Sequence, residues 1–131
     1  VVGSVMLTEA PKGVLMRVET RGLTPGWHGL HFHEKADCSK ADFTSAGGHT
    51  HGAGDRVHGL LNPKANETGD LPNLYVGADG VGSTEVFSAL TTLAALKDAD
   101  GSAVVIHAAA DDHLAQPIGG AGARVACAEV R

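Results

Sequence analysis

Aromatic residues, long hydrophobic runs and basic residues are all scarce in this chain. Only 4% of its 131 residues are Phe, Tyr or Trp. No apolar run approaches the roughly 20 residues of a transmembrane helix, so we expect no membrane partner. The formal net charge is −5, from 10 basic and 15 acidic residues. Because nucleic-acid binding depends on clustered Lys and Arg, which this chain lacks, we expect no nucleic-acid partner.

Cysteine is rare too, with only Cys38 and Cys127. Neither lies in a C-x-x-C motif. Two cysteines are the right number for one disulfide, which would close a loop of about 90 residues and stabilise the fold by roughly 4–5 kcal/mol at best. Such a bond would place the protein in an oxidising compartment. Two buried free thiols are the alternative.

Glycine, by contrast, is abundant, with 18 residues spread along the chain. Together with many Val, Ala and Thr residues, it favours short strands and turns over helices. The length predicts one domain, residues 1–131. Apolar residues alternate with polar ones between turn residues, which predicts an all-β antiparallel sandwich or barrel. The predicted strands are 2–7, 14–20, 28–33, 74–76, 83–90, 103–107 and 123–130.

Two segments interrupt the strand pattern. Residues 90–96 allow a short helix, although Thr91 and Thr92 disfavour it. Residues 39–71 are rich in Gly, His, Asn and Asp, and exceed the usual length of a connection without structure. A segment with so few apolar residues needs something besides a core to order it, and a bound metal would serve. We therefore expect a functional loop there.

A histidine pair, His31 and His33, flanks Phe32 in a predicted strand. In a strand, residues i and i+2 point to the same face, so the two imidazoles would converge. Imidazole is a common metal ligand that suits copper and zinc. Further candidate ligands lie in Gly-rich or strand-like settings or beside a turn: His49, His58, Asp70 and His107.

Longer motifs surround these residues in a fixed order. They are GWHGLHFHE (26–34), SAGGH (45–49), HGLLNP (58–63), GDLPN (69–73), GSAVVIH (101–107) and GGAGARVAC (119–127). Over nearly its whole length the chain resembles the bacterial copper,zinc superoxide dismutase family. The resemblance implies a Greek-key β-sandwich or barrel with long metal-binding loops. It also implies an enzyme that converts superoxide to dioxygen and hydrogen peroxide by redox cycling of copper.

The resemblance also implies roles for individual residues. Arg124 would attract the substrate anion beside the copper, and Asp111 would hydrogen-bond one copper ligand and one zinc ligand. His49 would bridge the two metals and deliver a proton during turnover. The implied copper ligands are His31, His33, His49 and His107, and the implied zinc ligands include His49, His58 and Asp70.

The fourth zinc ligand departs from the family pattern. Glu67 stands where the family has a histidine, three residues before Asp70. Glutamate can bind zinc through oxygen, so Glu67 is one candidate. A second candidate is His51, which would rotate inward from the altered segment after His49. In a third alternative the zinc site is weak or empty.

The family comparison implies several further properties. Cys38 and Cys127 match the family disulfide, and a periplasmic or extracellular location follows from it. Residues 2–7 match the second family strand, so the first strand is missing. Its absence would expose a sheet edge that a second copy could cover in a homo-oligomer. His28 is expected to bond the backbone and His113 to lie on the surface. The alternative functions are a copper-storing sandwich and a copper-only superoxide dismutase.

Overall fold

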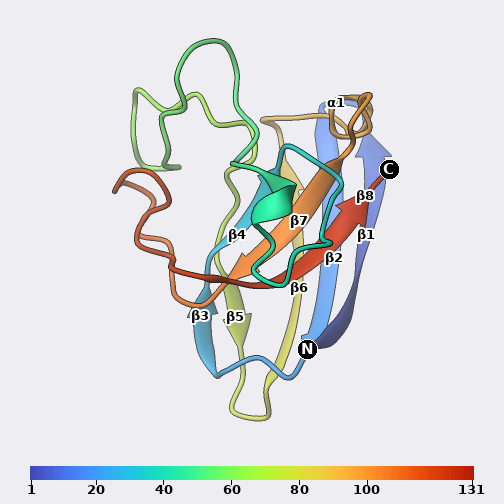
Figure 1. Ribbon diagram of the computed structural model, residues 1–131, viewed down its shortest axis with the longest axis vertical. Coiled ribbons are helices and arrows are strands. Elements are labelled where there is room, and N and C mark those ends of the chain that lie inside the picture. Colours follow the sequence, from blue (N-terminus) through green and yellow to red (C-terminus); the bar gives the residue numbers. More distant parts are fainter.

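Two antiparallel sheets face each other in the computed structural model, which describes residues 1–131 (Figure 1). One sheet has the strand order β1-β2-β6-β5-β3 and the other the order β4-β7-β8. The non-sequential neighbours, β2 beside β6 and β4 beside β7, are typical of a Greek key. The predicted antiparallel β-sandwich is confirmed. The strands are β1 (Val2–Ala10), β2 (Gly13–Arg21), β3 (Gly26–His28), β4 (Leu30–His33), β5 (Leu74–Val76), β6 (Val81–Ser88), β7 (Ser102–His107) and β8 (Arg124–Val130).

Helical structure is limited to the 3-10 turn η1 (Thr44–Ala46) and the short helix α1 (Leu93–Leu96). Neither has the length and apolar character that a membrane crossing requires. Thr92, which we expected to disfavour a helix, begins this one, because its side-chain oxygen accepts a hydrogen bond from Ala95 N at 3.1 Å. Threonine is unfavourable inside a helix but favourable as an N-cap.

The predicted strand 28–33 is wrong in one respect, because Gly29 divides it into β3 and β4 in different sheets. The main chain of Gly29 donates to Ala109 O and accepts from His107 N, each at 2.8 Å. A Cβ at this position would lie only 2.7 Å from the Cβ of Ala121. Glycine therefore permits the close backbone approach at which the chain changes sheets.

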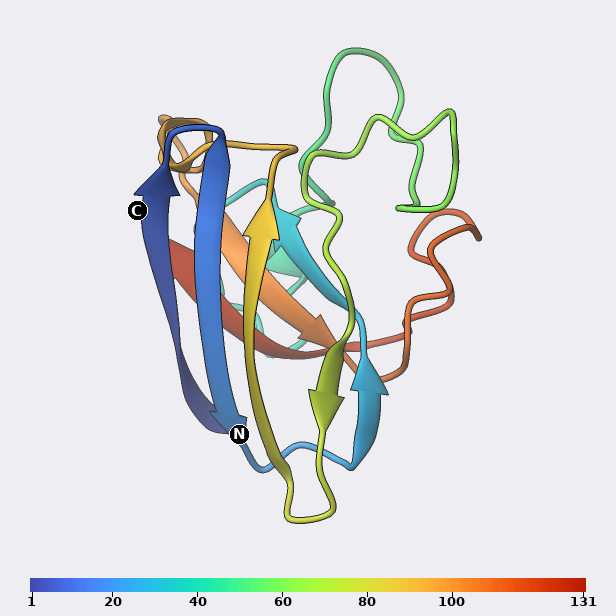
Figure 2. The same ribbon diagram turned by 180° about the vertical axis from the view of Figure 1, so that it is seen from behind.

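Phe32 and Leu30 point from β4 into the hydrophobic core between the sheets. Because side chains alternate along a strand, His31 and His33 lie on the other face of β4. That face is covered by the loop between β4 and β5 and the loop between β7 and β8 rather than by a sheet, and Figures 1 and 2 both place these two loops together beside β4. The core residues are Val14, Met16, Val18, Leu23, Leu30, Phe32, Leu71, Leu74, Val76, Leu96, Val104 and Ile106.

The long loop 39–71 is tied to β4 by main-chain hydrogen bonds. Phe32 N donates to Gly69 O and Phe32 O accepts from Thr50 N, both at 3.0 Å. Farther out, the side chain of Asn66 accepts from Val57 N at 2.8 Å and donates to two loop carbonyls. The loop thus satisfies many of its backbone groups itself, in addition to any order that a bound metal would supply.

β1 and β8 each lie at the edge of their sheet. β1 pairs only with β2, and β8 pairs only with β7. A mostly apolar groove of about 330 Å³ lies between these two strands. Each of the two strands therefore keeps one open edge.

Candidate metal centre

Four histidines from three parts of the chain converge on the loop-covered face of β4. β4 supplies two of them, and His33 also forms a β-bridge with His49, which brings that loop residue alongside. A β-bulge at the end of β7 sits between Ile106 and His107, and bulges commonly redirect a side chain. One ligand atom from each ring lies within 4.8 Å of the others, and all four side chains are buried: His31, His33, His49 and His107.

Each of these rings uses one nitrogen in a hydrogen bond and leaves the other free. His33 Nδ1 donates to Gly47 O at 2.9 Å, and His107 Nδ1 donates to Gly122 O at 3.0 Å. His31 uses Nε2, 2.7 Å from Asp111 Oδ2. The remaining nitrogens are buried without any hydrogen-bond partner: His31 Nδ1, His33 Nε2, His49 Nε2 and His107 Nε2. Buried polar atoms rarely stay unpaired, so four that converge fit a metal ion with four nitrogen ligands.

Burial keeps three of these imidazoles neutral. It lowers the pKa of His33 to about 2 and that of His107 to about 4. It also lowers the pKa of His31. A neutral ring keeps the lone pair that a metal needs, whereas an imidazolium has none to offer.

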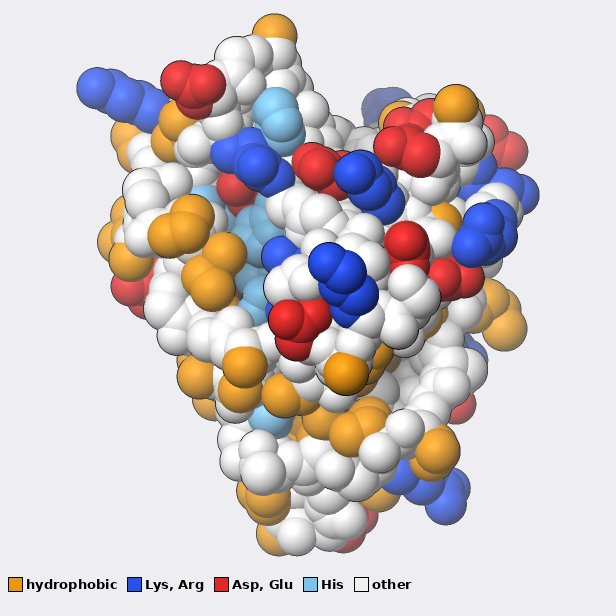
Figure 3. Space-filling model, in the orientation of Figure 1, with side chains coloured by type: hydrophobic (Ala, Val, Ile, Leu, Met, Phe, Trp, Pro, Cys, Tyr) orange, Lys and Arg blue, Asp and Glu red, His pale blue; other side chains and the backbone are white.

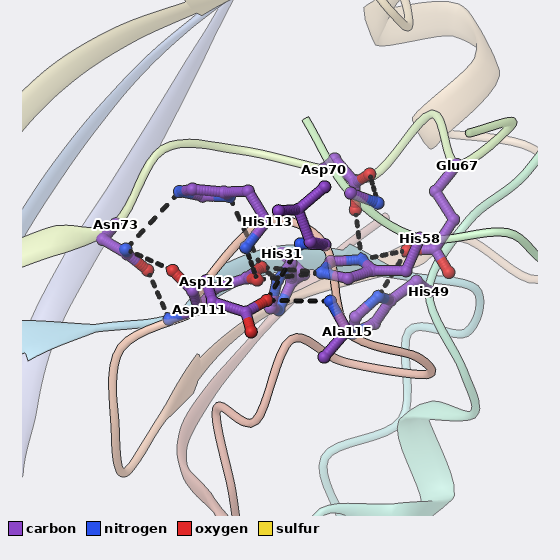
Figure 4. A network of polar contacts seen from close by, with 12 residues as sticks. His31, His49, His58, Glu67, Asp70, Asn73, Asp111, Asp112, His113 and Ala115 are labelled. Atoms are coloured by element: carbon purple, nitrogen blue, oxygen red, sulfur yellow. Dashed lines mark hydrogen bonds and ion pairs between the residues drawn. The ribbon is translucent and has the colours of Figure 1, made fainter. Parts of the chain in front are cut away.

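A second group lies on the other side of His49, where its Nδ1 faces two carboxylates and a further imidazole (Figure 4). His49 Nδ1 is 2.6 Å from Glu67 Oε1, and His58 Nδ1 is 2.8 Å from the same oxygen. Asp70 Oδ1 is also 2.8 Å from His58 Nδ1 but makes no directed hydrogen bond. Two imidazole nitrogens and two carboxylate oxygens are a donor set that zinc accepts.

Glu67 and His51 pair in an antiparallel β-bridge, but their side chains differ in burial and in hydrogen-bond partners. Glu67 is buried, with 5% of its surface exposed, and its carboxylate lies between the rings of His49 and His58. His51 is exposed, and its Nδ1 donates to Gly52 O at 2.7 Å. The structure therefore brings Glu67 into the second group and leaves His51 outside it.

The protonation of this second group is set by its carboxylates. Burial would lower the pKa of His58, but its contacts with the carboxylates of Asp111, Asp70 and Glu67 raise it to about 11. Burial would raise the pKa of Glu67, but hydrogen bonds from His49 and His58 hold that pKa well below its ordinary value. Without a metal, His49 Nδ1 and His58 Nδ1 carry protons that point at Glu67. A metal that binds these nitrogens would displace those protons.

Asp111 joins the two groups (Figure 4). Its carboxylate accepts from His31 Nε2 at 2.7 Å and from His58 Nε2 at 2.9 Å. Burial would raise the pKa of Asp111, but these bonds hold it well below its ordinary value. The main chain of Asp111 is fixed in turn by Asn73, whose side-chain amide makes two bonds of 2.9 Å with it. Such partners fix ring orientation and tautomer.

Arg124 lies next to the four-histidine group because it pairs with His107 between β7 and β8. Both residues line a cavity of about 250 Å³, together with Asp42 and Thr44. Arg124 Nη1 donates to Phe43 O at 2.8 Å. Burial lowers the pKa of Arg124, but a guanidinium stays charged at neutral pH. Figure 3 shows histidine side chains recessed in a hollow beside basic ones, which suits a small anion.

Two histidines outside the site can now be compared with expectation. The prediction for His28 is confirmed, since its ring nitrogens lie 2.6 Å from His107 O and 2.7 Å from Thr24 O. The prediction for His113 is wrong, because its side chain is only 19% exposed. A left-handed backbone (φ 65°) at His113 turns the ring toward Asn73 instead.

A disulfide joins Cys38 to Cys127. It anchors the loop after β4 to β8, where both cysteines pack against Ala46, Ala103 and Val105. The bond fits a location outside the reducing cytoplasm.

Some residues of the site were missed by the sequence analysis. Gly47 and Gly122 supply the carbonyls that hold His33 and His107, and both have positive φ. Asn73 stood inside a recognised motif, but its bond to Asp111 spans 38 residues. Contacts of this range depend on the fold and leave no local signal.

Comparison with known proteins gives concordant results. The sequence model of the family described as Copper/zinc superoxide dismutase (SODC) matches residues 1–130. The superoxide dismutase (Cu-Zn) of Caulobacter vibrioides is 58% identical over 135 residues, covering 98% of this chain and 78% of that protein. The crystal structure of a SOD-like protein from Bacillus subtilis has a TM-score of 0.87 at 36% identity, covering 99% of this chain and 90% of that one. Cu/Zn superoxide dismutase from Brucella abortus has a TM-score of 0.82 at 34% identity, covering 99% and 88%.

Proposed function

The chain belongs to the copper/zinc superoxide dismutase family, and we propose that its copper is held by His31, His33, His49 and His107. The enzyme converts superoxide to dioxygen and hydrogen peroxide. The observation that carries the proposed ligand set is the convergence of four unpaired buried nitrogens within 4.8 Å. Four imidazoles suit copper, which prefers nitrogen ligands of this kind.

For zinc we propose His49, His58, Asp70 and Glu67 as the ligands. The support is the short distance of Glu67 Oε1 from both Nδ1 atoms, together with the burial of this carboxylate. The two carboxylates would balance the charge of a bound divalent ion, so the occupied site would be electrically neutral. With a third histidine in place of Glu67, the occupied site would carry one positive charge. The oxygen of Glu67 also makes the donor set harder than that of three histidines.

Copper, when bound, supplies the one-electron steps that oxidise one superoxide to dioxygen and reduce another to peroxide. Peroxide cannot leave as a dianion, so protons must arrive with the electrons. We assign proton delivery to His49, whose two nitrogens face different donor groups and whose Nδ1 bonds to Glu67. A ring held in this way can either bind copper through Nε2 or carry a proton on Nε2.

Arg124 is assigned to the capture of the substrate anion. The net charge of −5 repels superoxide from the molecule as a whole, so attraction has to be local. The guanidinium lines the cavity that reaches His107. Asp111 acts through its two hydrogen bonds, which hold the rings of His31 and His58 in place.

A copper-storing protein would need the four histidines but neither Arg124 nor the His49 contact with a second donor group. The presence of both favours the enzyme over storage. A copper-only enzyme is disfavoured by the buried position of Glu67 among His49, His58 and Asp70.

The assignment is tested with His107→Ala and, as a matched histidine control, His51→Ala. We expect H107A to lose copper during dialysis and to lose superoxide turnover, because one of four converging nitrogens is gone. The main chain of His51 pairs with Glu67 in a β-bridge, but its exposed side chain bonds only to Gly52 O, so H51A should keep both properties. Near-normal turnover of H107A would refute the copper ligand set.

We also infer a periplasmic or extracellular location, supported by the disulfide. Cell fractionation checks it, and recovery in the cytosolic fraction would refute it. A homo-oligomer stays a prediction, supported by the open edges of β1 and β8. Light scattering decides between monomer and oligomer.

A further inference from the structure

Gln116 makes a reciprocal pair of hydrogen bonds with the main chain of His58, 58 residues away. His58 N donates to Gln116 Oε1 at 2.8 Å, and Gln116 Nε2 donates to His58 O at 2.7 Å. A carboxamide offers one acceptor and one donating group, as a peptide does. Only this orientation of the amide satisfies both bonds, so the side chain is held in one arrangement.

The same two segments meet at further points around His58. Asp111 accepts from the ring of His58 at 2.9 Å, and Leu61 N donates to His113 O at 3.1 Å. Gly59 lies against the main chain of His113 so closely that no Cβ would fit. Residues 111–116 therefore hold His58 at both its ring and its backbone.

The position of the His58 backbone determines where its ring nitrogen points. His58 Nδ1 lies 2.8 Å from Glu67 Oε1 and 2.8 Å from Asp70 Oδ1. The ring has only two torsions between it and the main chain, so a shift of the main chain moves Nδ1 away from the carboxylates. Gln116 itself is exposed, whereas His58 is completely buried. What Gln116 contributes therefore lies in its hydrogen bonds rather than in packing.

We propose that Gln116 is a positioning residue for the zinc site: its carboxamide fixes the main chain of His58 and thereby the direction of the ligand nitrogen. This rests on the proposed assignment of His58 as a zinc ligand. Partners behind the ligands commonly change metal affinity by about 10–100-fold when removed. Gln116 Nε2 also donates to Leu114 O at 2.9 Å, so the test must separate positioning from general stabilisation of the loop.

The experiment uses the copper- and zinc-loaded protein and four variants. Q116A removes both bonds, while Q116E keeps the size and the acceptor for His58 N but faces the His58 carbonyl with a second oxygen. L114A, in the same loop, removes an exposed side chain and is the matched control. H58A removes the ligand itself. Zinc release to a chromophoric chelator and copper release to a Cu(I) chelator are followed separately, and cobalt placed in the zinc site reports ligand geometry through its visible spectrum.

We expect zinc release to be about tenfold faster in Q116A and Q116E than in the parent protein, with a changed cobalt spectrum. Copper release and the L114A variant should match the parent. Zinc release within twofold of the parent in both Gln116 variants would overturn the proposal. So would equal acceleration of zinc and copper release with an unchanged cobalt spectrum, which indicates general loosening. Unaltered zinc retention in H58A would instead refute the ligand assignment on which the proposal rests.

Discussion

At the scale of single residues, the choice of nitrogen in each histidine decides what the site can bind. His33 and His107 donate Nδ1 to main-chain carbonyls, so Nε2 is left for a metal. His31 does the reverse because Asp111 takes its Nε2. The histidines themselves were predictable from H-x-H spacing and the surrounding motifs. Their tautomers were not, because each depends on a carbonyl or carboxylate brought in by a distant segment.

Replacing Glu67 tests the second site at this scale. We expect E67Q to lower zinc affinity by about tenfold or more, since a carboxylate ligand and its charge are lost. We expect E67H to retain zinc, because imidazole is also a good zinc ligand. Competition with a chelator of known affinity measures both.

H51A is the control for these variants, because the side chain of His51 is exposed and bonds only to Gly52 O, and the change leaves its main-chain pairing with Glu67 in place. Its zinc affinity should equal that of the parent protein. Weak zinc binding in H51A together with normal zinc binding in E67Q would refute this assignment and make His51, rather than Glu67, the zinc ligand.

Arg124 is the residue to which we assign substrate attraction. We expect R124A to lower the second-order rate constant with superoxide by about tenfold while leaving copper content unchanged, because a positive charge beside the cavity is lost. Asp42 lines the same cavity with the opposite charge, so D42N should raise the rate. Pulse radiolysis measures the rate, and an unchanged rate in R124A would remove steering from the mechanism.

At the scale of elements, strand positions followed from local pattern, but the breaks between strands did not. In β2 the alternation of Val14 and Met16 with exposed Arg17 was readable from the sequence. The division at Gly29 was not, because it depends on the approach of Ala109 and Ala121. A local pattern gives the period of a strand, whereas a change of sheet is decided by tertiary contacts.

The disulfide is the covalent link between two such elements. The double variant C38S/C127S should lower the free energy of unfolding of the metal-free protein by about 2–4 kcal/mol, because the unfolded chain gains the freedom of a long loop. Urea unfolding followed by circular dichroism gives this quantity. Equal midpoints for the parent and the variant would show that the link adds no stability.

At the scale of the whole molecule, the sandwich provides a rigid face and the loops complete the site. β4 presents Phe32 to the core and two histidines to the loops, so core and site share one strand. Family motifs in the sequence therefore predicted both the fold and the histidines that the structure brings together. The hydrogen bonds that join one loop to another, such as that of Asn73 with Asp111, required the folded chain.

Removing the metals should lower thermal stability, because a ligand that binds only the folded state stabilises it by mass action. We expect the midpoint of unfolding to fall on treatment with a chelator and to rise again with added zinc. The rise should be smaller in E67Q. Differential scanning calorimetry measures these shifts, and an identical midpoint with and without metals would contradict the account.

The central claim is that one chain holds copper and zinc in two adjoining sites. The most direct measurement is the metal content of the purified chain after loading with both metals and exhaustive dialysis, by mass spectrometry of the elements. We predict about one copper and about one zinc per chain, as two four-ligand sites require. Copper without zinc would refute the second site with Glu67, and the absence of firmly held copper would contradict the account as a whole.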